Sequence, residues 1–188
     1  MSEKFKGLYR NETFRAQWWD YRSEGSYHIT ICTENRVHYF GEIINEQICL
    51  SEIGKLANQF WSEIPNHFPH IQLDEFVIMP NHVHGILIIR DAADDDYRDF
   101  AMQHPYNPEQ QINDKSKISS SSYFSSIAPK SGSISVVIRS FKSVVSKHAH
   151  RINVDFRWQK LFHDRIIRDR DEFLRVKNYI RNNPRNWK

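Results

Sequence analysis

The sequence predicts an α+β protein with a ferredoxin-like split β-α-β sandwich, in which an antiparallel sheet carries helices on one face and a C-terminal helix follows. The main observation is the order of segments, which runs strand, helix, strand, strand, helix, strand, helix. A second is length, because 188 residues suit one domain with a buried core, so residues 1–188 are predicted to form a single domain. A third is composition: 39% hydrophobic and 13% aromatic residues indicate a folded chain.

The first half of the chain predicts a hairpin, one helix and a pair of strands. Apolar and polar residues alternate within residues 26–40, and Glu34-Asn35 offers turn chemistry, so this segment predicts a β-hairpin. Residues 51–61 place apolar side chains three and four apart behind Ser51, which predicts a capped helix. Residues 73–79 and 82–90 then predict an antiparallel pair of strands joined by a turn.

The second half begins with a segment that lacks apolar periodicity. Residues 91–132 contain an acidic run and a serine run, and they predict a mobile insertion that the core does not need; a loop that orders on a ligand is the alternative. An amphipathic helix follows from Ile134 onward. Residues 158–168 predict one more strand, and the final helix opens at Asp171.

Charge is distributed unevenly along the chain. The net charge is +3, yet residues 131–188 contain 14 basic and 5 acidic side chains, which leaves the rest of the chain acidic. A basic C-terminal third favours a polyanionic partner, and a solvated helix face without a partner is the alternative.

Compartment and membrane association follow from simple exclusions. No apolar run reaches the roughly 20 residues that cross a bilayer, so no membrane association is expected. The charged, aromatic N-terminus has no signal-peptide core, so a cytoplasmic location is expected. Cys32 and Cys49 are expected to be free thiols.

Two histidines open the second strand of the predicted pair. Successive strand side chains alternate between faces, so His82 and His84 point to one face and Val83 to the other. Two such imidazoles can bind one divalent ion, and two ordinary strand histidines are the alternative. Gly85 follows at once, and a glycine within a strand often marks the close approach of a backbone or ligand.

These residues carry a resemblance to a known family. The segment MPNHVHGILII, residues 79–89, is similar to the His-hydrophobic-His motif of the HUH superfamily of single-stranded DNA nucleases. With NYIRNNPRNW, residues 178–187, it resembles the single-tyrosine transposases, and among them the REP-associated tyrosine transposases. The fragments YHITICTENRVHYFG, IRSFKSVVSKHA and WQKLFHDRIIRD agree, so the resemblance spans most of the chain outside residues 91–132.

The resemblance implies a set of site residues. It implies that His82 and His84 bind Mg²⁺ or Mn²⁺, that Tyr179 is the nucleophile and that Asn183 completes the metal site. From spacing alone, Tyr179 and Asn183 are four apart and share one face of a helix, so they can address one point. A packed tyrosine and an asparagine that merely ends the helix are the alternatives. Two imidazoles suit Mn²⁺ better than Mg²⁺.

The implied activity is metal-dependent cleavage and rejoining of single-stranded DNA that carries a hairpin, through a 5′-phosphotyrosine intermediate. Two other functions stay open: a hairpin-binding regulator without strand transfer, and a metal hydrolase of nucleic acid that uses water. Both a monomer and a homodimer are compatible with the sequence.

Basic residues of the C-terminal third are the predicted phosphate contacts. They are Arg139, Lys142, Lys147, Arg165, Arg168 and Arg181. The aromatic residues Trp18, Trp19, Tyr21 and Trp187 are candidate platforms for unpaired bases, with packing of the chain ends as the alternative.

Overall fold

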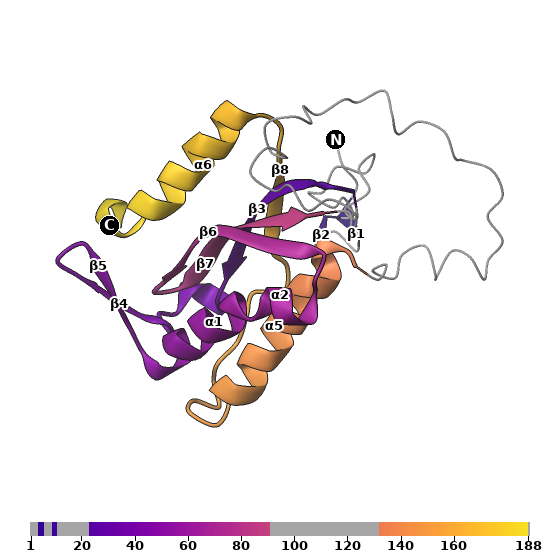
Figure 1. Ribbon diagram of the computed structural model, residues 1–188. Coiled ribbons are helices and arrows are strands. Elements are labelled where there is room, and N and C mark those ends of the chain that lie inside the picture. Colours follow the sequence, from indigo (N-terminus) through magenta and orange to yellow (C-terminus); the bar gives the residue numbers. More distant parts are fainter. Residues whose placement is uncertain (1–3, 6–8, 11–22, 91–131, 188) are drawn as a thin grey trace, which may run out of the picture.

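The computed structural model describes residues 4–5, 9–10, 23–90 and 132–187. Its centre is a four-stranded antiparallel sheet in the order β6-β7-β3-β8 (Figure 1). The elements of the sheet and its helices are β3 (Gly25–Cys32), α1 (Glu52–Ser62), α2 (Ile64–His67), β6 (Ile71–Met79), β7 (His82–Ile89), α5 (Ile134–Ala149), β8 (His163–Ile167) and α6 (Arg170–Asn182). This strand order with two crossover helices is the predicted ferredoxin-like arrangement, so the predicted fold class is confirmed.

The two faces of the sheet bury different helices. Figure 1 shows α1 and α5 on one side of the sheet and α6 on the other. Alternation along β7 explains this, because Val83, Leu87 and Ile89 join the large core with α1 and α5, whereas Ile86 and Ile88 form a smaller cluster with Ile180 of α6. The sheet is therefore covered on both sides, and the face under α6 is the one that receives His82 and His84.

Helix boundaries follow ordinary capping chemistry. The Ser51 hydroxyl accepts a hydrogen bond from the Gly54 N–H at 3.0 Å and starts α1 where the sequence predicts it. Asp169 does the same for α6, accepting from the Glu172 N–H at 2.7 Å. Helix α6 then ends at Asn183, where the short 3-10 helix η4 (Pro184–Asn186) takes over.

The hairpin predicted for residues 26–40 is wrong. Strand β3 pairs with β7 and β8, and the chain then enters the 3-10 helix η1 (Glu34–Arg36). The Thr33 hydroxyl bonds the carbonyls of Val37 at 2.8 Å and Asn81 at 3.0 Å, which fastens this stretch to the β6–β7 turn.

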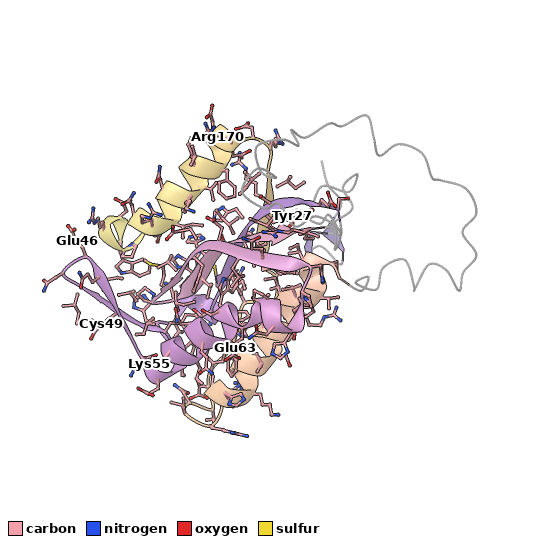
Figure 2. The ribbon with its side chains drawn as sticks, in the orientation of Figure 1. Tyr27, Glu46, Cys49, Lys55, Glu63 and Arg170 are labelled. Carbon is pink, nitrogen blue, oxygen red and sulfur yellow. The ribbon has the colours of Figure 1, made fainter. Side chains whose placement is uncertain are left out.

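The hairpin of this region lies further along the chain. It joins β4 (Gly41–Ile44) to β5 (Gln47–Leu50) through Asn45 and Glu46, whose φ angles of 51° and 62° suit a two-residue turn. Figure 2 shows Glu46 at the tip of this hairpin and Tyr27 within the sheet.

The strand predicted for residues 158–168 is shorter than expected. Only His163–Ile167 forms β8, while Trp158 makes a single bridge to Thr33. Next to this bridge the Gln159 N–H donates to the Cys32 carbonyl at 2.9 Å, and the Lys142 ammonium of α5 takes up the carbonyls of Gln159 at 2.7 Å and Lys160 at 3.2 Å, so these two carbonyls bond a side chain and no strand.

Some predicted segments fall outside the described residues. The insertion at 91–132 lies there except for Gly132, as do Trp18, Trp19 and Tyr21. A two-stranded ribbon, β1 (Lys4–Phe5) with β2 (Tyr9–Arg10), is described near the N-terminus. Within the described ranges, the helices are too short or too polar to span a membrane.

Gly85 has a structural role that differs from the expected ligand contact. A Cβ at this position would overlap the indole of Trp61, and it would lie 3.1 Å from Cβ of Phe76. Strand alternation explains the difference, because Gly85 faces α1 whereas the neighbouring histidines face α6.

Replacing Gly85→Ala is therefore expected to lower the free energy of unfolding by about 1–3 kcal/mol, since an added methyl in a packed core forces neighbours to shift. Urea denaturation measures the loss. In a Trp61→Phe background the smaller ring leaves space, so the loss should shrink. An equal loss in both backgrounds would show that the indole does not impose the glycine.

Candidate functional site

The histidine pair is buried beneath α6. His82 and His84 are 6% and 7% exposed, and their ring centroids lie 4.5 Å apart. They occupy the first and third positions of β7, so the strand turns both rings to the same face. The two imidazoles are thus close enough to address a single atom.

Asn81 sets the proton position on His82. The amide oxygen of Asn81 lies 2.8 Å from Nδ1 of His82, and its amide nitrogen donates to the Arg36 carbonyl at 3.2 Å. A carbonyl only accepts, so the second bond fixes which end of the amide faces the ring. Nδ1 of His82 therefore carries the proton, and the lone pair on Nε2 is left for another partner.

His84 is held between a threonine and a tyrosine. Its Nδ1 lies 2.8 Å from the Thr30 hydroxyl of β3, and its Nε2 lies 3.5 Å from the Tyr179 hydroxyl of α6. A hydroxyl both donates and accepts, so Thr30 is compatible with a proton on Nδ1. In that tautomer the lone pair on Nε2 faces Tyr179.

One cavity joins the predicted residues. It has a volume of about 360 Å³, and it is lined by Thr30, Arg36, His82, His84, Tyr179, Asn183, Asn186 and Trp187. Tyr179 is 49% exposed, and Asn183, one helical turn later, is 8% exposed. The structure thus brings the histidine pair, the tyrosine and the asparagine of the sequence prediction to one place.

Burial keeps both imidazoles neutral. It lowers the pKa of His82 to about 4, with a smaller contribution from the Arg36 guanidinium. It also lowers the pKa of His84 to about 3, helped first by His82 and then by His28. At neutral pH both rings therefore present lone pairs, which is the form that binds a metal.

The donor set is suited to a divalent ion that keeps open positions. It offers two neutral imidazole nitrogens and the amide oxygen of Asn183, and it leaves room in the cavity for a substrate oxygen. Within the described ranges, no group of three or more His, Cys, Asp or Glu side chains could hold a metal. An ion at this place would therefore depend on an amide and on substrate oxygens in place of a carboxylate.

Three residues of the site were not predicted from the sequence. Arg36 lines the cavity on a turn in which Asn35 and Arg36 have φ angles of 53° and 57°. Asn81 and Thr30 fix the two rings. Thr30 lies opposite His84 in the β3–β7 register, a pairing that the spacing of residues in the sequence does not reveal.

The predicted DNA-contact residues separate into two groups. Arg139, Lys142 and Lys147 lie on α5, on the opposite face of the sheet from the histidines. Arg165 and Arg168 lie on β8 and the turn before α6, and Arg181 lies on α6, paired with Glu75 at 2.7 Å. Only this second group shares the side of the sheet that carries the cavity (Figure 1).

Comparison with known proteins gives a family and a fold. A protein of Haemophilus influenzae (strain ATCC 51907 / DSM 11121 / KW20 / Rd), described as uncharacterized, is 35% identical over 191 residues, spanning 100% of this chain and 96% of that protein. The chain therefore belongs to the same family as that protein. No family model matches the sequence.

Among solved structures, a REP-associated tyrosine transposase bound to a REP hairpin superposes with a TM-score of 0.52 and 15% identity. The match covers 93% of this chain and 73% of that one. It shows that the two proteins share a fold.

The burial of the histidines gives a pH-dependent stability. In the unfolded chain each titrates near 6.5, and in the folded metal-free protein near 4 and 3. At pH values between the folded and the unfolded pKa, the unfolded state binds more protons than the folded state. The free energy of unfolding therefore falls as pH drops below about 6.5. From pH 7.5 to 5.5 the loss should be roughly 1 kcal/mol for each histidine. Urea denaturation of a His82→Asn/His84→Asn variant should show a smaller loss, and an equal loss would contradict the assignment.

If His82 and His84 bind a divalent ion, as predicted from the sequence, Asn81 should control its affinity without touching it. Asn81→Leu removes the acceptor for Nδ1 of His82, so we expect the Mn²⁺ dissociation constant to rise by about 10–100-fold. Isothermal calorimetry with Mn²⁺ measures it. Asn58→Leu, at an exposed position of α1, is the matched control and should leave the constant unchanged. Unchanged Mn²⁺ binding in Asn81→Leu would rule out this positioning role.

Proposed function

We propose that this protein is a metal-dependent single-stranded DNA endonuclease and strand transferase, with Tyr179 as its nucleophile. The observation that carries the proposal is the 3.5 Å approach of the Tyr179 hydroxyl to Nε2 of His84 inside a cavity shared with His82 and Asn183. A phenol beside two neutral imidazoles is suited to attack on a phosphodiester, since Mg²⁺ or Mn²⁺ at this place would supply a Lewis acid for the phosphoryl oxygen.

The covalent step balances as a transesterification. The Tyr179 oxygen bonds to phosphorus, and the bond from phosphorus to the 3′-oxygen breaks. The phenolic proton passes to water, because Tyr179 is half exposed, and the departing 3′-oxygen takes up a proton. The product is a 5′-phosphotyrosine, and it retains the phosphodiester energy so that another 3′-hydroxyl can reverse the step.

The neighbouring residues have separate roles in this scheme. His82, His84 and Asn183 would hold the ion, and Asn81 and Thr30 keep the two rings oriented. The Arg36 guanidinium lies at the cavity, where it offsets the negative charge of a bound phosphate. The indole of Trp187, whose ring centroid is 5.9 Å from that of His82, offers a surface on which an unpaired base can stack.

The proposed substrate is single-stranded DNA that carries a hairpin. Its support is the shared fold with the transposase that is bound to a REP hairpin, together with the one tyrosine among the described residues that line the cavity and the arginines Arg36, Arg165 and Arg175 that line this cavity and its neighbour. A protein that uses one tyrosine makes one cut in each active site, so each site would cleave and rejoin a single DNA strand.

Covalent capture tests the proposal. A pool of end-labelled hairpin oligonucleotides with randomised flanks is incubated with the protein and Mn²⁺, and the products are separated on a denaturing gel. We expect a protein–DNA adduct that carries the 3′-end label, because the tyrosine is joined to the 5′ phosphate of the downstream fragment, while the 5′-end label leaves with the upstream fragment. Tyr179→Phe should abolish the adduct because it deletes only the nucleophilic oxygen.

The matched control is Tyr39→Phe, because the Tyr39 hydroxyl donates to the Asp155 carbonyl at 2.7 Å and Tyr39 does not line the cavity. It should form the adduct at the wild-type rate. Cleavage that survives Tyr179→Phe would indicate a hydrolase that uses water. Hairpin binding without cleavage in the wild type would indicate a DNA-binding regulator.

A further inference from the structure

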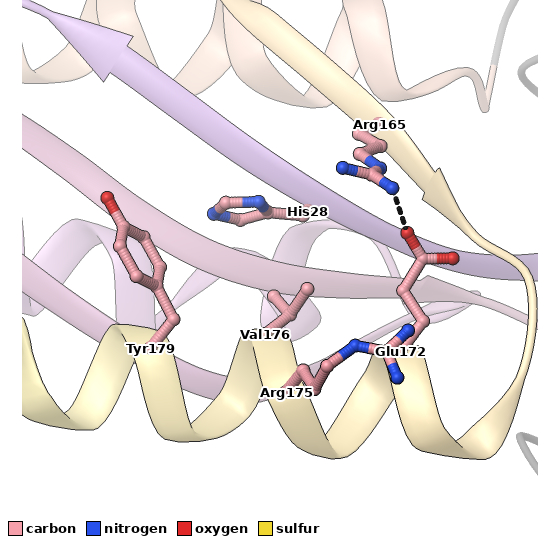
Figure 3. Close-up of a pocket in the computed structure, with 6 residues that line it drawn as sticks. All are labelled: His28, Arg165, Glu172, Arg175, Val176 and Tyr179. Atoms are coloured by element: carbon pink, nitrogen blue, oxygen red, sulfur yellow. Dashed lines mark ion pairs between the residues drawn. The ribbon is translucent and has the colours of Figure 1, made fainter.

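A second cavity lies beside the first along α6. Its volume is about 270 Å³, and Tyr179 borders both cavities. Figure 3 shows its wall: side chains from one face of α6 rise toward His28 of β3 and Arg165 of β8. The lining residues are His28, Arg165, Glu172, Arg175, Val176 and Tyr179. The α6 members are three and four residues apart, which places them along one face of the helix, leading away from the tyrosine.

The charge of this second cavity is positive. Glu172 is buried and already engaged, since one carboxylate oxygen pairs with the Arg165 guanidinium at 2.6 Å and the other accepts the Arg168 N–H at 3.0 Å. This pair fixes Arg165, whose side chain is 72% exposed. Arg175 forms no ion pair with any other described residue. One guanidinium is therefore held in place, and the other has no carboxylate partner in the part of the chain that the structure describes.

His28 adds a hydrogen-bonding group that lacks a partner. Its Nε2 is buried, and no described residue bonds to it. His28 is the register partner of Arg165, so both side chains project from adjacent strands on the α6 side. Burial, aided by the Arg165 charge, lowers the pKa of His28 and favours the neutral ring. A buried polar atom without a partner is costly, and a bound acceptor relieves that cost.

We propose that this second cavity binds a backbone phosphate of single-stranded DNA, next to the phosphate that Tyr179 attacks; this rests on the proposed function. Arg175 supplies the net charge, Arg165 offers a guanidinium that Glu172 holds in place, and His28 donates from Nε2. Arginine forks match the anionic oxygens of a phosphate, which favours a backbone phosphate over an uncharged base. Arg175 precedes Tyr179 by about one helical turn, roughly 5.4 Å along the axis, so the strand would run along α6 between the two cavities.

Salt dependence tests the phosphate contact without relying on cleavage. Binding of fluorescent oligo(dT) to the Tyr179→Phe protein in EDTA is measured by anisotropy over a KCl series. Loss of one phosphate contact lowers the slope of log K against log[KCl] by about 0.7 for a single strand, so Arg175→Gln should show this decrease. The control is Arg170→Gln, on the first turn of α6 and outside the cavity (Figure 2), which should keep the slope.

His28→Leu tests whether His28 contributes a hydrogen bond to the DNA and no charge. It should weaken binding about three- to tenfold, the effect of one hydrogen bond, and leave the salt slope unchanged. Thermal melting of each variant checks that the fold persists. Because Arg175 is exposed, its substitution should disturb packing least.

The outcomes distinguish this site from the proposed function. If Arg175→Gln keeps the slope, if Arg170→Gln lowers it equally, or if oligo(dT) does not bind, the phosphate site is wrong. If the slope falls as expected while no hairpin in the pool yields an adduct, the phosphate site stands and the strand-transfer activity is wrong. If the adduct forms and the slope is unchanged, only the phosphate site fails.

Discussion

The packing of α6 against the sheet decides whether a tyrosine meets the histidines at all. Ile180, next in sequence to Tyr179, is fully buried with Ile86, Ile88 and Ile167. Because Ile86 and Ile88 follow His82 and His84 on the same face of β7, one strand supplies both the anchor for the helix and the rings beneath it. A helix shifted by one turn would carry the phenol about 5.4 Å away from Nε2 of His84.

Ion pairs at an irregularity in the sheet reinforce this placement. The register of β6 shifts between Leu73 and Phe76, so the strand bulges at Asp74 and Glu75. Asp74 then pairs with Lys177 at 2.8 Å, and Glu75 pairs with Arg181 at 2.7 Å. Lys177 and Arg181 lie on either side of Tyr179, so the bulge ties both neighbouring turns of α6 to the edge of the sheet. Because these ion pairs are partly exposed, they add little to the free energy of unfolding. Their main effect is to fix the position of α6 along the sheet.

The sequence contained the outline of the site but not its supporting residues. The spacing of His82 and His84 predicted that both rings share one face of a strand, because strand alternation depends only on spacing. The four-residue spacing of Tyr179 and Asn183 likewise predicted that they share one face of a helix. Arg36 could not be found in this way, since its place depends on two non-glycine residues with positive φ, a conformation that no pattern of apolar residues encodes. Whether these residues act on DNA stays a prediction.

Asn81 was foreseen as part of a turn, yet its amide also orients His82, and local turn chemistry does not reveal that second bond. The hairpin at residues 26–40 failed for a related reason. Glu34-Asn35 does form a tight turn, but the side chain of Thr33 directs the chain to the β6–β7 turn, a contact between residues 48 apart in sequence. Gly85 was misinterpreted because the sequence does not show Trp61 on the opposite face. In each case a long-range contact decided between local alternatives.

The proposed active site requires two imidazoles and a phenol to meet around one cation. The most direct measurement is anomalous diffraction at the manganese edge from crystals of the Tyr179→Phe protein grown with Mn²⁺ and single-stranded DNA. We expect one anomalous peak, from a manganese ion bound to Nε2 of His82 and Nε2 of His84. A DNA phosphate should lie between this ion and the side chain at position 179. A peak at any other place, or histidine rings that turn Nε2 away from each other, would contradict the proposed site.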